Sequence, residues 1–241
     1  MSPYIVIIPT YNEIENAEAI VRKTLSLEPQ FDILIVDDNS PDGTANLIKK
    51  LQQEFVGRLH LLERKEKNGL GTAYIAGFKW CLQKDYQYIF EMDADFSHNP
   101  DDLPKLLEPC LKDGAGLTIG SRYITGVNVV NWPMSRVIMS YYASAYVRFI
   151  TRMTIRDATA GFVCYTRQTL EKINLDKIKF KGYAFQIEMK FKAVLAQVKV
   201  VEVPIIFTDR TKGTSKMSKK IFREAFFGVI ELKINSWFRK S

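Results

Sequence analysis

The chain has 241 residues, of which 46% are hydrophobic and 25% charged, and these proportions predict a folded globular protein and exclude extended disorder. Its formal net charge of +7 and pI near 9.2 fit a negatively charged partner: a nucleic acid, an anionic membrane surface or a phosphate-bearing substrate. No nucleic-acid-binding motif accompanies the charge, so we expect no nucleic acid partner.

The three cysteines, Cys81, Cys110 and Cys164, are far apart in the sequence and lack the spacing of a metal site. We expect them to be reduced, buried thiols of a cytosolic protein. The N-terminus leads directly into an apolar strand, which argues against a signal peptide. No stretch reaches the ~18 apolar residues that a membrane-spanning helix needs.

The first half of the chain alternates between short apolar runs and amphipathic segments. Strands are expected at residues 4–8, 33–36, 59–62, 88–92 and 116–120, and helices at 15–27, 44–55, 72–83 and 101–111. This repeated strand–helix order predicts an α/β protein with an open, mostly parallel central sheet and helices on both faces. In such sheets, ligands bind beyond the carboxyl ends of the strands.

The second half is less regular. Helices are expected at 133–153, from 168, at 182–196 and at 220–237, and strands at 198–203 and 205–207. Residues 209–219 read as a loop rich in basic residues, glycine, serine and threonine. No internal repeat or low-complexity linker interrupts the chain, so we expect one domain over residues 1–218 and a C-terminal amphipathic helix over 219–241.

Two carboxylates, Asp93 and Asp95, follow the apolar run at 88–92. If the extended geometry continues through Asp95, both side chains point to the same side, because strand side chains alternate with period two. Two adjacent carboxylates attract a hard divalent cation, and Mg²⁺ or Mn²⁺ suits an oxygen site that leaves positions open for substrate phosphates. The alternative is a solvated acidic turn, since Asp-x-Asp alone is common.

Polar residues follow three further strands of the predicted sheet. They are residues 9–13, the pair Asp37 and Asp38, and Arg122. Because parallel strands end at the same edge of a sheet, these residues and the Asp93–Asp95 pair are expected to meet there. Four strand ends with polar residues favour a binding site over a coincidence.

Six motifs occur in order along the chain. They are Pro9-Thr10-Tyr11-Asn12-Glu13, Asp37-Asp38-Asn39-Ser40-Pro41-Asp42-Gly43-Thr44, Gly69-Leu70-Gly71-Thr72-Ala73-Tyr74, Asp93-Ala94-Asp95-Phe96-Ser97-His98, Gly182-Tyr183-Ala184-Phe185-Gln186, and Asp209-Arg210 to Ser215-Lys216. In this combination the sequence resembles the inverting family 2 glycosyltransferases of the GT-A fold, over about residues 4–219. Within them it is most similar to the branch that transfers mannose to polyprenyl (dolichyl-type) phosphate.

The resemblance implies that residues 1–218 form a GT-A catalytic domain with a GDP-mannose donor. The residues implied for the donor nucleotide are Pro9, Tyr11, Glu13, Val36, Asp38, Asp93, Ala94, Asp95, Arg210 and Lys216. Asp93 and Asp95 are the implied metal ligands, and Arg210 and Lys216 would stabilise charge on the leaving diphosphate. The alternatives are a core-edge aromatic for Tyr11 and a solvated loop for the two basic residues.

The implied acceptor is a polyprenyl phosphate. It is already ionised at pH 7, so its oxygen needs positioning in line with the anomeric carbon rather than a general base. Arg122, Arg136 and Ser140 match family positions that bind this phosphate, and an arginine fork holds phosphate bidentately. Arg136 and Ser140 are spaced i, i+4 on one helix face. The alternative for Arg136 is an ordinary exposed helix arginine. The implied catalytic set is Asp93, Asp95, Arg122, Arg210 and Lys216.

Two positions depart from the family pattern. Many relatives have glycine where Asn39 stands, but asparagine tolerates left-handed backbone, so we expect little change. Some relatives have glutamine where Ser97 stands, so a metal contact at that position would need a shorter arm or a water.

Many relatives carry C-terminal transmembrane helices, and this chain has no such stretch. Residues 219–241 combine large apolar and basic residues, which fits an interfacial helix on the cytoplasmic face of a membrane. The alternative is a helix packed on the domain, and a small membrane-spanning partner subunit is also open. The rival functions are transfer from UDP-glucose or another sugar nucleotide, and a non-catalytic nucleotide-binding module at the membrane surface.

Overall fold

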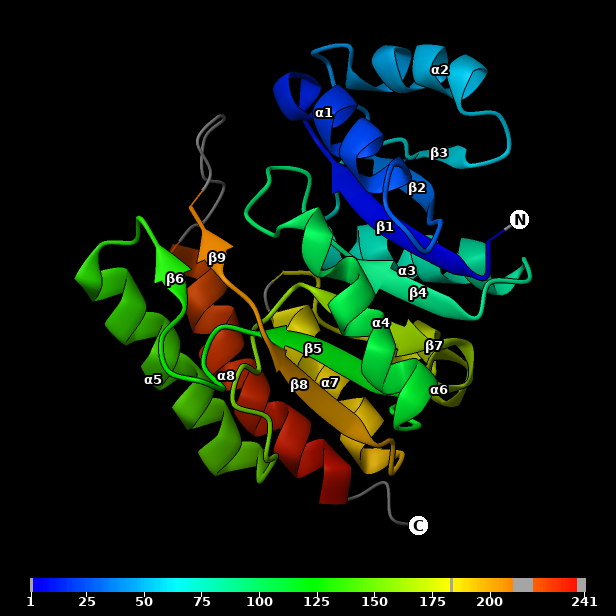
Figure 1. Ribbon diagram of the computed structural model, residues 1–241. Coiled ribbons are helices and arrows are strands. Elements are labelled where there is room, and N and C mark those ends of the chain that lie inside the picture. Colours follow the sequence, from blue (N-terminus) through cyan, green and yellow to red (C-terminus); the bar gives the residue numbers. More distant parts are fainter. Residues whose placement is uncertain (1, 183, 210–218, 238–241) are drawn as a thin grey trace.

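The computed structural model describes residues 2–182, 184–209 and 219–237. Seven strands form one sheet in the order β3-β2-β1-β4-β7-β5-β8 (Figure 1). Their bounds are β1 Tyr4–Thr10, β2 Asp32–Asp37, β3 Leu59–Glu63, β4 Tyr88–Glu91, β5 Leu117–Ser121, β7 Val163–Thr166 and β8 Val200–Pro204. All neighbouring pairs are parallel except those that β7 makes, which confirms the predicted open, mostly parallel sheet.

Helices cover both faces of the sheet (Figure 1). Their bounds are α1 Ile14–Leu25, α2 Thr44–Glu54, α3 Leu70–Leu82, α4 Leu103–Lys112, α5 Met134–Thr151, α6 Arg167–Lys172, α7 Ala184–Leu195 and α8 Lys219–Trp237, with 3-10 turns η1 Pro100–Asp102 and η2 Leu175–Lys177. Each face of the sheet has its own hydrophobic core, and side chains of β1 alternate between them. Ile5 and Ile7 pack towards α3 and α7, whereas Val6 and Ile8 pack towards α1 and α4.

Strand β7 lies in the middle of the sheet and was not predicted from the sequence. It pairs antiparallel with both β4 and β5, so its N-terminal end lies at the edge where its neighbours end. Its four residues give too short a pattern to separate a strand from the start of α6, and a long-range pairing decides the outcome. The segment 157–161, just before β7, is thereby brought to the edge where the predicted site residues lie.

The C-terminal helix α8 packs against α5 and α7, and α5 and α8 lie side by side (Figure 1). Val229 and Leu232 of α8 are buried in the same core as α7, and the Phe226 ring stacks on Tyr146 of α5 with centroids 4.7 Å apart. The helix is therefore integrated into the domain. Two short strands form a separate parallel pair. β6 Val129–Val130 precedes α5, and β9 Phe207–Thr208 follows β8.

The cysteines match expectation. All three cysteines are free and buried, as predicted. Over the described part of the chain, no helix is both long and apolar enough to cross a bilayer.

Candidate active site

The motif after β2 is a hydrogen-bonded network that holds the loop after β1. The Asp37 carboxylate accepts hydrogen bonds from the Thr10 hydroxyl at 2.8 Å and from the Ser40 hydroxyl at 2.6 Å. The Ser40 hydroxyl oxygen in turn accepts from the Asn12 backbone N–H at 3.0 Å. Asn39 has φ +59°, so the left-handed backbone expected at this position is confirmed.

Asp42 and Thr44 continue this network towards α1. Asp42 accepts from the Ile14 N–H at 3.1 Å and from the Thr44 hydroxyl at 2.6 Å, and the Thr44 hydroxyl oxygen accepts from the Glu13 N–H at 3.2 Å. These hydrogen bonds outweigh partial burial and lower the pKa of Asp42. The Ser-Pro-Asp-Gly-Thr motif thus positions the residues predicted to contact the nucleotide.

The predicted nucleotide residues of β1 and β2 lie at this edge, with two basic residues that the sequence analysis did not name. Pro9 is in β1 itself, in register with Val36, rather than ending the strand. Asp38 is buried and forms an ion pair with Arg64 at 3.0 Å, and burial raises the pKa of its carboxyl. The Lys67 ammonium lies 4.1 Å from the Tyr11 ring centroid.

Asp93 and Asp95 lie in a turn rather than on an extended strand. β4 ends at Glu91, and Phe96 has φ +59°, so the alternation expected to direct both carboxylates to one side does not apply. Asp93 is partly exposed, whereas Asp95 is buried and accepts from the Ser97 N–H at 3.0 Å and the Ser97 hydroxyl at 2.5 Å. Ser97 therefore orients Asp95.

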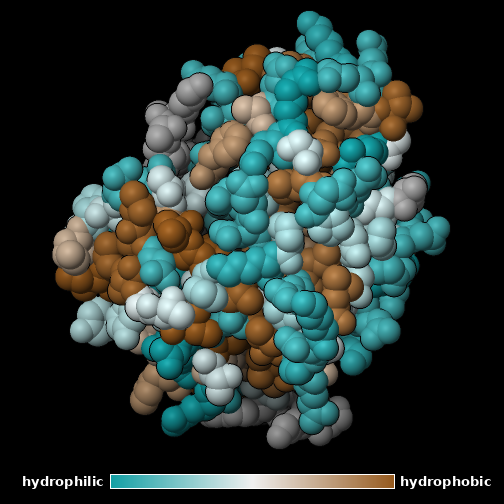
Figure 2. All heavy atoms as spheres, viewed as in Figure 1, coloured by the Kyte–Doolittle hydropathy of each residue, from teal (hydrophilic) through white to brown (hydrophobic). Residues whose placement is uncertain are grey.

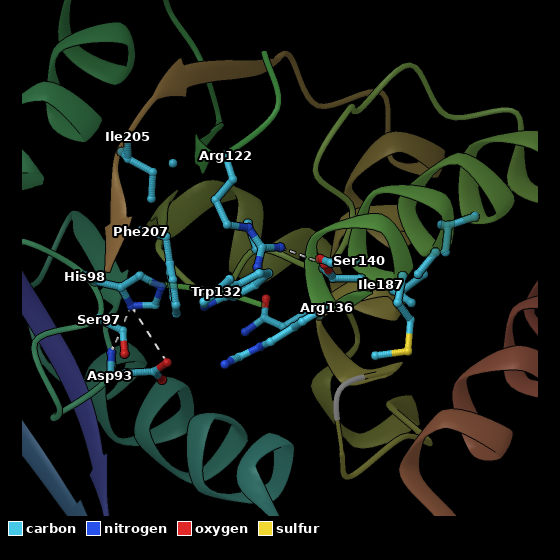
Figure 3. A pocket seen from close by; sticks show the side chains of 18 of the residues that line it. Asp93, Ser97, His98, Arg122, Trp132, Arg136, Ser140, Ile187, Ile205 and Phe207 are labelled. Carbon is cyan, nitrogen blue, oxygen red and sulfur yellow. Dashed lines mark hydrogen bonds and ion pairs between the residues drawn. The ribbon is translucent and has the colours of Figure 1, made fainter. Parts of the chain in front are cut away.

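A cavity of about 400 Å³ brings Asp93 together with the three residues predicted to bind the acceptor phosphate. Asp93, Arg122, Arg136 and Ser140 all line it (Figure 3). The other predicted donor residues that the structure describes do not line this cavity: Pro9, Tyr11, Glu13, Val36, Asp38, Ala94 and Asp95. Arg210 and Lys216 lie outside the described residues.

Arg122 is buried and reaches the cavity with a partner already in place. Its Nε and Nη2 donate to the two carboxylate oxygens of Asp157 at 2.7 and 2.6 Å, and Nη2 also donates to the Thr159 hydroxyl at 2.8 Å. The Arg122 charge and hydrogen bonds outweigh complete burial and hold the pKa of Asp157 below its ordinary value. The antiparallel β7 places Asp157 here, which no local pattern indicated.

Arg136 projects from the first turns of α5. Its Nη1 donates to both carboxylate oxygens of Asp209 at 3.0 Å, and its guanidinium lies 4.0 Å from the Trp132 ring centroid. The interpretation of Arg136 as an ordinary exposed helix arginine is therefore wrong, since it is half-buried, paired and part of the cavity wall.

His98 holds the Asp93 turn through a hydrogen bond to its backbone. Its Nδ1 accepts from the Asp93 N–H at 3.3 Å, and its ring stacks on Phe162 with centroids 4.9 Å apart. Burial lowers its pKa to about 4, so the ring is neutral at physiological pH. The sequence motif contained His98, but the fold was needed to show what it contacts.

A buried polar relay lies beneath the cavity and was not predicted. Lys190 of α7 donates to the Gln186 side-chain oxygen at 3.0 Å and to the Ala160 carbonyl at 2.6 Å, and the Gln186 amide donates to Glu91. Burial raises the pKa of Glu91 to about 8 and lowers that of Lys190 to about 8. The relay joins the end of β4, α7 and the segment before β7, which all border the cavity.

Gly71 in the first turn of α3 allows α3 and α7 to pack closely. A Cβ on Gly71 would lie 2.7 Å from Phe185, and the Gly71 N–H donates to the Lys181 carbonyl at 2.8 Å. The Gly-Leu-Gly and Ala-Phe-Gln stretches are therefore two sides of one contact.

Comparison with known proteins agrees with this geometry. The model of the family described as glycosyl transferase family 2 matches residues 5–174. The chain belongs to glycosyltransferase family 2. It is 48% identical to a polyprenol monophosphomannose synthase of Mycolicibacterium smegmatis, over 94% of this chain and 85% of the relative. It is 45% identical to an undecaprenyl-phosphate mannosyltransferase of Micrococcus luteus, over 92% of this chain and 90% of the relative.

Solved structures support the fold of this family 2 enzyme. One is glucosyl-3-phosphoglycerate synthase from Mycobacterium tuberculosis in complex with Mn²⁺, UDP and glucosyl-3-phosphoglycerate, with a TM-score of 0.66 at 15% identity over 96% of this chain and 78% of that chain. The same protein with Mn²⁺, UDP-glucose and glycerol 3-phosphate gives a TM-score of 0.64, over 96% and 79% of the two chains. The predicted GT-A fold is confirmed.

Proposed function

We propose that this glycosyltransferase transfers mannose from GDP-mannose to a polyprenyl phosphate with inversion, giving polyprenyl-phosphate β-mannose and GDP. The names of the two relatives with 45–48% identity support the sugar and the acceptor. GDP as the nucleotide rests on the motif resemblance alone.

The observation that carries the proposal is the mixed chemistry of the cavity. One end presents Asp93 with Arg122 and Arg136, which suits sugar and phosphate groups. The wall formed by α5 and α8 is apolar, with Met139 and Val229 among its residues. An ionic head and a hydrocarbon tail are the two parts of a polyprenyl phosphate, so one space accommodates this acceptor beside the donor.

The donor set fits a divalent metal, because its oxygens are hard carboxylate donors and Asp93 borders the cavity. Among the described residues, no three His, Cys, Asp or Glu side chains gather into a metal cluster. Asp93 and Asp95 would therefore hold Mg²⁺ or Mn²⁺ together with water and the donor phosphates. When bound, such an ion supplies Lewis-acid stabilisation of the diphosphate.

The protein's own residues would orient the reactants. Pro9, Tyr11 and Glu13 at the end of β1 would contact the nucleotide, with Val36 and Asp38 at the base. Arg122, Arg136 and Ser140 would hold the acceptor phosphate on the other side of the anomeric carbon. Arg210 and Lys216 would close over the donor diphosphate and stabilise leaving-group charge.

A lipid acceptor implies contact with a membrane, and the outer face of α5 supports this part of the proposal. Met134, Ile138, Tyr142 and Phe149 follow helical spacing along one stripe and are 50–70% exposed. Figure 2 shows apolar atoms gathered on the side of the molecule where α5 lies. We infer peripheral binding to the cytoplasmic face of a membrane, through α5 together with the predicted interfacial helix α8; a small membrane-spanning partner subunit is the alternative anchor.

The test is transfer of labelled sugar to a short-chain polyprenyl phosphate in detergent, with GDP-mannose and UDP-glucose as donors and with or without Mg²⁺ or Mn²⁺. We expect metal-dependent transfer from GDP-mannose. Transfer from UDP-glucose alone would keep the mechanism and replace the donor. Absence of transfer from any sugar nucleotide would contradict the proposal.

The variant Asp93→Asn separates an enzyme from a non-catalytic membrane module. We expect turnover to fall by at least about 100-fold, because the variant loses a metal and diphosphate contact. Vesicle binding should persist, since Asp93 lines the cavity and is not part of the exposed stripe of α5. Unchanged turnover would remove Asp93 from the active site.

A further inference from the structure

Trp132 occupies the centre of the cationic end of the cavity, yet no motif pointed to it. It lies between β6 and α5 and lines the cavity (Figure 3). The Arg136 guanidinium lies 4.0 Å from its ring centroid and that of Arg122 lies 5.5 Å away. Phe207 packs edge-on against the ring with centroids 5.3 Å apart. One indole therefore supports both arginines that are proposed to bind the acceptor phosphate.

The indole N–H of Trp132 is a second feature of the site. Its Nε1 is buried and has no hydrogen-bond partner within the part of the chain that the structure describes. A buried N–H without a partner costs free energy, whereas a phenylalanine ring would support the arginines without that cost. The unpaired donor is explained if a ligand in the cavity supplies the acceptor atom.

The charge balance around the ring identifies the chemistry of that ligand. Arg122 is paired with Asp157, and Arg136 with Asp209. The wall therefore offers two partly neutralised cations and one neutral N–H donor. A phosphate monoester suits this combination, because it presents several oxygens that accept hydrogen bonds at once and carries negative charge that the guanidiniums attract.

We propose that Trp132 is an acceptor-binding residue: its indole N–H donates to a phosphate oxygen of the acceptor while its ring holds Arg136 and Arg122 in position. This inference rests on the proposed function, since it concerns the acceptor of that reaction. It adds an aromatic residue with an N–H donor to a site that the resemblance described only by arginine and serine.

The sharpest test replaces one atom. Trp132→β-(3-benzothienyl)alanine keeps the two-ring shape and replaces the N–H by sulfur, so packing and the arginine contacts persist. Trp132→Phe removes the N–H with part of the ring, and Trp132→Leu removes the aromatic face as well. Trp80→Phe is the matched control, because Trp80 lies on α3 against His60 and does not line the cavity. KM for each substrate and kcat are measured for every variant.

We expect the benzothienyl and phenylalanine variants to raise the acceptor KM by roughly 10- to 100-fold, the range for a hydrogen bond to a charged group. The donor KM and kcat should stay unchanged, and Trp132→Leu should raise the acceptor KM further. Trp80→Phe should alter none of these values. A purely structural role for Trp132 would instead lower kcat together with thermal stability.

An unchanged acceptor KM in the benzothienyl variant would overturn the inference while leaving the proposed function standing. An increase in the donor KM alone would overturn it as well, because the N–H would then serve the diphosphate. Failure of the unmodified protein to transfer any sugar would refute the proposed function itself, and this inference with it.

Discussion

Arg122 and Asp157 form a buried ion pair whose partners are 35 residues apart in sequence. Asp157 is fully buried and Arg122 is 8% exposed, so removing the carboxylate charge would leave an uncompensated cation in the protein interior. We expect Asp157→Asn to lower the free energy of unfolding by about 3–5 kcal/mol, measured by urea denaturation. The Lys79–Asp176 pair on the surface is the control, where Asp176→Asn should cost less than about 1 kcal/mol. Equal effects at both sites would refute this interpretation.

Asn39 tests the backbone requirement of the motif after β2. Its φ of +59° is readily adopted by glycine and asparagine, but it crowds the Cβ of other residues. We expect Asn39→Gly to change the free energy of unfolding by less than about 0.5 kcal/mol and Asn39→Val to lower it by about 1–2 kcal/mol. If the two variants are equally stable, as judged by thermal and urea unfolding, the left-handed conformation is not what selects the residue.

Helix α5 has two faces with different tasks. One face lines the cavity with Arg136 and Ser140, and the other exposes Tyr142 and Phe149, which are 67% and 68% exposed. Arg152 and Arg156 follow the apolar stripe, and the Arg152 guanidinium lies 5.4 Å from the Phe149 ring centroid. This combination of aromatic and basic groups fits the surface of an anionic bilayer.

The double variant Tyr142→Ser/Phe149→Ser should weaken binding to anionic vesicles by about tenfold or more, because two apolar side chains no longer enter the interface. Transfer to a short-chain acceptor in detergent should be unchanged, since neither residue lines the cavity. Leu111→Ser on α4 is the control, an exposed apolar residue away from α5. Loss of vesicle binding in the control but not in the double variant would contradict a membrane-facing α5.

The sequence pattern correctly predicted those helices and strands whose formation depends mainly on residues nearby in the sequence. Apolar runs predicted β1 and β2, and the amphipathic segments that follow them predicted α1 and α2. Pattern failed where distant segments decide the outcome. β7 is a strand because it pairs with both β4 and β5. Asp93 and Asp95 lie in a turn after β4 because His98 and Ser97 form hydrogen bonds with them.

The same distinction applies to the site. Arg122, Arg136 and Asp93 were predicted from motifs and share one cavity, whereas Asp157 and Trp132 were not predicted, because each acts through a contact that only the folded chain creates. The Glu91–Gln186–Lys190 relay was also missed, since a buried charge is not distinguishable from a surface charge by residue type.

At the scale of the whole molecule, the cavity joins the edge of the sheet to the layer formed by α5 and α8. Asp93 at the sheet edge lines one cavity with Arg122 and Arg136, and we propose that the sugar lies between the diphosphate near Asp93 and the acceptor phosphate. A phosphate held by Arg122 and Arg136 would approach the anomeric carbon from the side opposite the diphosphate near Asp93. Single displacement in this arrangement inverts the configuration at that carbon.

The most direct test is the anomeric configuration of the mannosyl phosphate product, determined by NMR after transfer from the α-linked donor GDP-mannose. We expect a β-linked product throughout the reaction. An α-linked product would contradict it, because retention requires a second displacement or attack from the diphosphate side, and the cavity would then be assigned to the wrong face of the sugar.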